Sequence, residues 1–336
     1  MQDLEAAARN LVSDLHEPQG AIFWTDATGS AVVGWTAFVV AVVSEPFSTR
    51  MFAGIALAAA ALYRGLCFIH ELTHLRRKSL PGFETAWNIL FGVPLLLPSF
   101  TYQGVHQSHH NLSTYGTKED PEYLPFASSR RLMIGFAVQS TLVLPALLLI
   151  RFLLLGPIGL VWPRFHRWME VHASAFSMNP AYCREVTPAI NQKIRRWEIA
   201  IVAAWGLLFI EIFAGITPPR VLGLWYVVLA CVSFLNTARV LGAHEYDSDG
   251  NPRSRQGQLS DSIDTPGGPW TELWAPVGLR YHALHHYFPG IPYHNLGRAY
   301  RRLISRLPHD STYRDSTSPS LRRSLSALYA KALKAK

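Results

Sequence analysis

The segment MFAGIALAAAALYRGLCFIHELTH, residues 51–74, decides the fold class of this chain. Its first part, residues 51–69, is an apolar run of about 20 residues, the length of a helix that crosses the hydrocarbon core of a bilayer. The run continues directly into HELTH, which fits H-E-x-x-H and places His70 and His74 one helical turn apart on one face. The segment therefore predicts a membrane helix that ends in a metal-binding pair.

Further apolar runs make this a polytopic membrane protein. Charged residues form only 16% of the chain, against about 25% in typical soluble domains. Residues 31–43 and 51–69 are predicted to form one pair of crossings, and residues 199–215 and 221–240 a second pair. Residues 132–162 are interrupted by Arg151 and Gly156-Pro157 and predict a hairpin or a kinked span. Residues 86–100 are short and contain Pro94 and Pro98, which favours a re-entrant or interfacial segment.

The expected fold is therefore all-α, with about four full transmembrane helices, re-entrant or interfacial helices, and a cytoplasmic histidine-rich cap. The cytoplasmic side follows from the charges, because short cytoplasmic loops carry an excess of Lys and Arg. The turns inside the predicted pairs carry only Arg50 and Arg220. The segments between the pairs carry Arg76, Arg77, Lys78, Arg130, Arg131, Arg164, Arg167, Lys193, Arg195 and Arg196. The net charge of +8 thus flanks the spans and does not form the single basic stripe of a nucleic-acid-binding protein.

The two ends of the chain are expected to be amphipathic. The first 17 residues place Leu4, Leu11 and Leu15 at helical spacing and lack the small-residue site of a cleavable signal. We expect residues 1–29 to form a cytoplasmic amphipathic segment, residues 30–305 the membrane domain, and residues 306–336 a linker with a basic amphipathic helix that lies on anionic lipid.

Eight of the fourteen histidines fall into three tight groups. These groups are HELTH (His70, His74), HQSHH (His106, His109, His110) and HALHH (His282, His285, His286). Positions i, i+3 and i+4 of a helix share one face, so each group presents its imidazoles in one direction. An even number of crossings separates the groups, which places all three at one membrane surface. Packed imidazolium ions would repel one another, whereas metal binding uses the neutral form.

Eight imidazoles exceed the three or four protein ligands of one zinc site, so the groups imply two metals. Imidazole suits Zn, Cu, Fe and Ni, so paired hydrolytic metals and dioxygen chemistry both stay open. A zinc protease with Glu71 as general base requires the other six histidines to be incidental, and we reject it. A metal transporter would place its histidines within spans along a path, whereas these lie at span ends.

The three groups, in this order and separated by spans, resemble the histidine boxes of the membrane-bound fatty acid desaturase family, bacterial type. The likeness continues in DPEYLPF (residues 120–126), GAHEYDSDG (residues 242–250) and the stretch from Gly278 to Leu303. It covers roughly residues 30–305, and three boxes together are a specific signal. Because the third box begins with His282 and no cytochrome b5 segment is fused, a front-end desaturase is disfavoured. Alkane hydroxylases share the first box type but differ in the other two.

The resemblance implies a non-haem di-iron centre with O2 as oxidant in a protein of the bacterial inner membrane. The implied ligands are His70, His74, His106, His109, His110, His282, His285 and His286, with His244 as the ninth. Because His244 stands alone, its alternative role is that of a polar residue at a helix end. The expected reaction is desaturation of an acyl chain in a lipid or thioester; the alternative is a hydroxylase, ketolase or acetylenase on the same scaffold. No redox domain is encoded, so an external donor such as a ferredoxin is expected to dock on the basic surface.

Ligating imidazoles need partners for their second ring nitrogen. Candidate partners are Glu71, Asp120, Glu245 and Asp261, whereas Asp247 and Asp264 are expected to be exposed loop acids. The family often places an asparagine near the ligand that His244 represents; here Val240 is one turn back and Asn236 two turns back. Asn111 and His294 adjoin the boxes as hydrogen-bonding residues. Four tryptophans near span ends are expected to be interfacial anchors: Trp24, Trp35, Trp87 and Trp162. Four isolated histidines have no assigned role: His16, His166, His172 and His309.

Overall fold

The structure, a computed structural model, describes residues 8–76, 78–308 and 311–335. Within these ranges every regular element is a helix, and the only strand-like pairings are isolated bridges. The prediction of an all-α fold is confirmed. Leu4, Arg77 and His309 lie outside the described residues.

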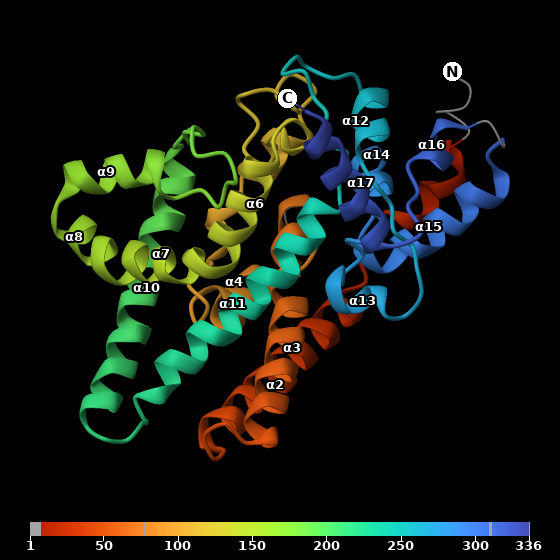
Figure 1. Cartoon of the computed structure of the whole chain (residues 1–336). Helices are drawn as coiled ribbons and strands as arrows, with labels where there is room; N and C mark the ends of the chain where they lie inside the picture. The colour runs from red at the N-terminus through yellow and green to blue at the C-terminus, as the bar shows by residue number, and fades with distance from the viewer. Residues whose placement is uncertain (1–7, 77, 309–310, 336) are drawn as a thin grey trace.

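Two long helical hairpins form the centre of the molecule. Figure 1 shows α2 (Gly20–Val43) alongside α3 (Thr49–His74), whereas α10 (Pro188–Phe213) and α11 (Arg220–Leu241) diverge from the turn that joins them; both turns lie at the lower end of the view. α2 and α3 approach closely because their interface carries small residues. A Cβ on Gly34 would lie 2.7 Å from the Leu62 side chain, and one on Gly54 would lie 2.9 Å from the carbonyl oxygen of Ala37.

Among the described residues, four helical stretches are long and apolar enough to cross a membrane: α2, α3, the run from Arg130 to Val161, and α11. The expected number of spans is confirmed, but the members differ from the prediction. The predicted span at residues 199–215 forms the second part of α10, whose first part carries Lys193, Arg195, Arg196 and Glu198. Because of these charges α10 is not one of the four stretches that meet the length and composition of a span, although its second part is apolar and it is joined to α11 by a turn.

The run from Arg130 to Val161 is one curved helical path. It consists of α6 (Arg130–Val138), η5 (Gln139–Val143), α7 (Leu144–Leu149), η6 (Ile150–Leu155) and α8 (Gly156–Val161). η5 and η6 are π-helical, and Pro145 and Pro157 are the second residues after them, so the bends occur where the regular hydrogen-bond ladder is interrupted. In Figure 1 this run crosses α11 and α10 and continues into α9 (Pro163–His172).

Residues 86–100 form a buried, irregular connection and not a span. α4 (Phe83–Trp87), η2 (Asn88–Gly92) and η3 (Ser99–Thr101) alternate here with turns. Trp87 was expected to anchor the membrane interface, which is wrong: it is 1% exposed and donates a hydrogen bond to the carbonyl oxygen of Gly65. The missing side chain of Gly65 also makes room for the Phe91 ring, which a Cβ there would approach to 2.1 Å.

The remaining helices gather at the end opposite the hairpin turns (Figure 1). They are η1 (Ser13–Leu15), α5 (Val105–His109), η4 (Phe126–Ser128), α12 (Arg255–Asp261), α13 (Thr271–Trp274), α14 (His282–Tyr287), α15 (Tyr293–Arg306), α16 (Thr312–Asp315) and α17 (Leu321–Lys334). α17 was expected to turn its apolar face to lipid, but Leu325 and Leu328 pack inside the protein with Leu241 and Tyr246.

Candidate metal centre

Four chain segments bring nine imidazoles together. α3 ends at His74, so it presents His70 and His74 at its last turn. The short α5 carries His106 and His109, with His110 as its C-terminal cap. α14 carries all three histidines of the third group, and His244 follows the end of α11.

The imidazoles divide into two groups. In one group, ligand nitrogens of His70, His74, His106 and His285 all lie within 4.8 Å of one another; in the other, those of His109, His244, His282 and His286 do so. His110 completes the first group, since its Nε2 lies 3.0 Å from Nε2 of His106 and 3.1 Å from Nε2 of His285. It also stacks on His286 with a centroid separation of 4.3 Å, so the two groups are adjacent.

The geometry of the nitrogens fits two metal ions. Nε2 of His282 lies 2.8 Å from Nε2 of His244 and 3.1 Å from Nε2 of His286. Nitrogens that bind one metal at about 2.1 Å lie about 3 Å apart, so these rings could hold a single ion between them. Both ring nitrogens of His70 and Nε2 of His74 are buried without a hydrogen-bond partner in the described part of the chain. Such nitrogens are costly to bury unless they bind something.

Burial keeps most of these rings in the form that binds metal. It lowers the pKa of His106, His110, His282, His285 and His286 well below the ordinary value, and the neighbouring imidazoles lower it further. The rings are therefore neutral near pH 7, with lone pairs available to a metal.

Carboxylates outside the two groups orient three of the rings. Both carboxylate oxygens of Asp120 lie 3.0 Å from Nδ1 of His109. Burial lowers the pKa of His109, but the charge and hydrogen bond of Asp120 outweigh it, so the pKa is raised. Nδ1 of His244 lies 2.9 Å from the Tyr115 hydroxyl and 3.4 Å from Asp261. Burial raises the pKa of Asp261, but its hydrogen bond with His244 and the other nearby groups lower it to about 2 overall.

The third carboxylate, Glu122, was missed by the sequence analysis. It lies 2.6 Å from Nδ1 of His106 and also accepts a hydrogen bond from Tyr102. Burial raises its pKa. Its position two residues after Asp120, inside the DPEYLPF segment, was the available signal. Hydrogen bonds from ligating rings to carboxylates fix the ring tautomer and raise ligand basicity.

The other predicted carboxylates have different roles. Glu71 lies 3.5 Å from Nδ1 of His70 and accepts a hydrogen bond from the backbone of Tyr293, which ties α3 to α15. Glu245 was expected beside a histidine, but it pairs with Lys331 at 2.6 Å, because α17 passes over it.

Asp264 was expected to be an exposed loop acid, which is wrong. It is buried and accepts hydrogen bonds from the backbone of Leu284 and the hydroxyl of Tyr313. It therefore holds α14, which carries the third histidine group. Asp247 is exposed, as expected, and pairs with Arg253.

The predicted amide and histidine neighbours make local contacts. Asn236 accepts a hydrogen bond from Arg239 at 2.9 Å. The backbone of Gln19 donates to Nε2 of His294, and the backbone and hydroxyl of Ser113 donate to Asn111.

Comparison with known proteins gives the family. The sequence profile of the family described as fatty acid desaturase matches residues 48–317. This chain belongs to the fatty acid desaturase family. A curated relative, the ceramide hydroxylase of Caulobacter vibrioides (strain NA1000 / CB15N), is 38% identical over 330 residues, which cover 97% of this chain and 93% of that protein. The resemblance seen in the sequence is confirmed, and the relative favours the hydroxylase alternative over the desaturase prediction. The members of this family are oxidoreductases, and this chain is therefore an oxidoreductase by family.

Proposed function

We propose that this protein is an O2-dependent lipid hydroxylase that acts on a ceramide-class substrate. One oxygen atom of O2 enters a C–H bond to give an alcohol, and the other leaves as water with two electrons and two protons from outside the chain. The observation that carries this proposal is the 38% identity with a ceramide hydroxylase over 97% of the chain.

We propose two iron ions as the metals. The first would be held by His70, His74, His106, His110 and His285, and the second by His109, His244, His282 and His286. Bound iron would supply the reduction of O2 and the oxidation of an unactivated C–H bond. The protein supplies the rest: buried neutral rings, carboxylates that fix them, and a site from which bulk water is excluded.

The lining of the opening to the histidines supports a substrate with polar groups near the reacting carbon. A small cavity of about 20 Å³ touches His70, His106 and His282 and is also lined by polar Tyr102, Glu122 and Arg239 and by Met178, Val240 and Tyr246. An unsubstituted acyl chain that reacts at its middle carries no oxygen there that could accept a hydrogen bond from the Arg239 guanidinium. The amide and hydroxyl groups of a ceramide lie close together at one end and offer oxygens to such a donor.

Arg239 is the group best placed to donate hydrogen bonds to those oxygens. Its Nη2 donates to Asn236, while its Nε is buried and has no hydrogen-bond partner among the described residues. A buried donor without a partner is costly, and a substrate oxygen would satisfy it.

Desaturation stays the second candidate, supported by the family description. Both reactions begin with removal of one hydrogen from an unactivated carbon, and the position of the chain decides between oxygen return and loss of a second hydrogen. We also propose the bacterial inner membrane as the location, with the histidines facing the cytoplasm and a ferredoxin-like donor. The basic segments between the hairpins support this orientation.

Product analysis tests the proposal. The full chain is expressed in a host that is supplied with a defined ceramide, and extracted lipids are analysed by mass spectrometry. A product heavier by one oxygen atom supports hydroxylation, whereas a product lighter by two hydrogen atoms identifies a desaturase. His109→Ala serves as the inactive control, and ceramide left unchanged by an iron-loaded protein with a working donor would overturn the proposal.

A further inference from the structure

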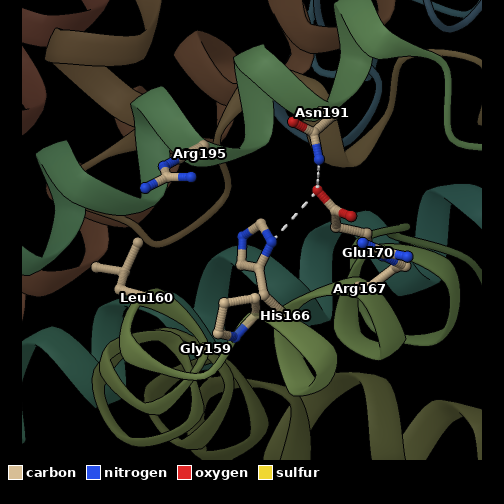
Figure 2. Close-up of a pocket in the computed structure, with 8 residues that line it drawn as sticks. Gly159, Leu160, His166, Arg167, Glu170, Asn191 and Arg195 are labelled. Carbon is tan, nitrogen blue, oxygen red and sulfur yellow. Dashed lines mark hydrogen bonds and ion pairs between the residues drawn. The ribbon is translucent and has the colours of Figure 1, made fainter.

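A second cavity lies away from the histidines, between α8, α9 and α10. It has a volume of about 190 Å³ and is lined by Gly159, Leu160, Pro163, His166, Arg167, Glu170, Asn191 and Arg195 (Figure 2). Its walls combine one apolar side from α8 with cationic and polar side chains from α9 and α10. The metal centre makes no use of these residues.

The acidic groups of this region are buried and satisfied from within. Glu198 accepts hydrogen bonds from Arg151 and lies 2.9 Å from Nε2 of His166. Glu170 accepts one from Asn191 and lies 3.4 Å from Nδ1 of His166. Because buried charges need partners, this network holds the two carboxylates in place, although Glu170 still forms part of the cavity wall.

The mouth of the cavity carries the surplus positive charge. Arg167 and Arg195 are exposed and lie on opposite sides of His166 in Figure 2. In the part of the chain that the structure describes, neither guanidinium forms an ion pair. Two guanidiniums that flank one cavity suit a phosphate, whose oxygens accept charge-assisted hydrogen bonds.

The surroundings of the cavity have the residue pattern of a membrane interface. Along α10 the charged residues Arg195 and Arg196 give way to an exposed apolar surface that begins at Ile199, which is 50% exposed. Along α9 the rings of Trp162, Phe165 and Trp168 follow one another at centroid separations of 5.8 Å. Tryptophans are enriched at the interface between hydrocarbon and water, so this pattern is the one expected where Arg195 faces the phosphates of a bilayer.

We propose that this cavity binds the phosphate of an anionic phospholipid, with Arg167 and Arg195 on its oxygens. The apolar side formed by Leu160 then contacts the glycerol and the upper part of an acyl chain. The shared chemistry is a phosphate group, which a soluble phosphate ester also carries; the position at the interface favours the lipid. Near an anionic membrane surface each Lys or Arg contributes about 1 kcal/mol, so both side chains together favour an anionic headgroup at this cavity.

The test measures retained lipid by native mass spectrometry. The full-length protein is released from nanodiscs that contain equal amounts of phosphatidylglycerol and phosphatidylcholine. The unmodified protein should keep phosphatidylglycerol preferentially, and Arg167→Gln/Arg195→Gln should lose at least about tenfold of that retention, as expected when two contacts of about 1 kcal/mol each are removed. Arg130→Gln/Arg131→Gln, which removes the same charge from the exposed start of α6, is the matched control and should retain the lipid.

Two further arms make the result decisive. Leu160→Trp fills the cavity without a change of charge and should lose the same retention, which also covers the case in which the double arginine variant does not fold. Glycerol phosphate is added to the detergent-solubilised protein as the soluble probe. Equal retention by the cavity variants and the α6 control would overturn the proposal, as would binding of glycerol phosphate without retention of the lipid. Because the readout is lipid and not product, failure here leaves the proposed hydroxylase function untouched.

Discussion

The carboxylate of Glu122 lies 2.6 Å from Nδ1 of His106, while Asp120, two residues earlier, lies 3.0 Å from Nδ1 of His109. Although both rings come from the HQSHH segment, they belong to different ones of the two spatial groups that could each hold a metal. One short loop after α5 therefore orients a ligand of each proposed metal. A disturbance of this loop should affect both positions of the centre, and not one alone.

We expect Glu122→Ala to lower iron content and hydroxylation by about 10- to 100-fold, the usual cost of removing a carboxylate partner from a ligating histidine. Glu122→Gln keeps an acceptor and should retain more of both. Metal analysis and product formation measure the effect. Glu119→Ala is the matched control, because Glu119 is an exposed acid three residues away. Unchanged iron in Glu122→Ala would show that the His106 ring needs no partner.

His244 provides a test of the ninth ligand. It lies outside the three histidine groups of the sequence, yet its Nε2 is 2.8 Å from that of His282. His244→Ala should lose iron and activity as completely as His282→Ala, since each removes a ligand of the same metal. His172→Ala, an isolated histidine whose ring contacts Cys183, should retain both. Normal iron content in His244→Ala would reduce the set to eight ligands.

The histidine groups were predictable because their geometry is local. Residues at i, i+3 and i+4 share a helix face wherever the helix lies, and α3, α5 and α14 all keep that register. Apolar length likewise predicted α2, α3 and α11, since the bilayer imposes it. Convergence of His244 with the third group followed only from the resemblance to a family.

The errors arise where a distant segment decides the environment. Glu245 was assigned to a histidine, but Lys331 of α17 reaches it from the far end of the chain. Asp264 was expected in solvent, but Tyr313 and the start of α14 cover it. Trp87 was placed at the membrane interface, but it is buried in the core, where its indole donates a hydrogen bond to the carbonyl oxygen of Gly65. None of these contacts has a signal in the local pattern.

Removal of the metal should make stability depend on pH. Burial lowers the pKa of the folded-state rings of His106, His282, His285 and His286 from the ordinary value of 6.5. Below pH 6.5 the histidines of the unfolded chain become protonated, whereas the buried rings of the folded chain stay neutral. The contribution of these rings to the free energy of unfolding is therefore full above pH 6.5 and is lost as the pH falls below 6.5. Three groups with a raised pKa oppose this, namely Asp264 (raised by burial to about 7), His109 and Glu122, but the rings with a lowered pKa outnumber them.

We therefore expect chelator-treated protein to melt at a lower temperature at about pH 5.5 than at about pH 7.5, because several rings change charge across this interval. Scanning fluorimetry in detergent measures the transition. The iron-loaded protein should shed metal over the same interval, since ligation requires neutral imidazole. A melting temperature of the chelator-treated protein that stays constant across this range would contradict the burial of these rings.

Arg239 should govern which lipid is accepted. Its buried Nε has no partner among the described residues, and its side chain lines the opening beside the histidines. If a ceramide oxygen satisfies this donor, Arg239→Leu should reduce kcat/KM for ceramide by tenfold or more, because a lost hydrogen bond to a charged group costs about 1.5–3 kcal/mol. Iron content should be unchanged, since Arg239 binds no metal. A lipid that lacks the amide should be turned over equally by both proteins, and an equal loss with both lipids would show that Arg239 maintains the shape of the site and does not read the substrate.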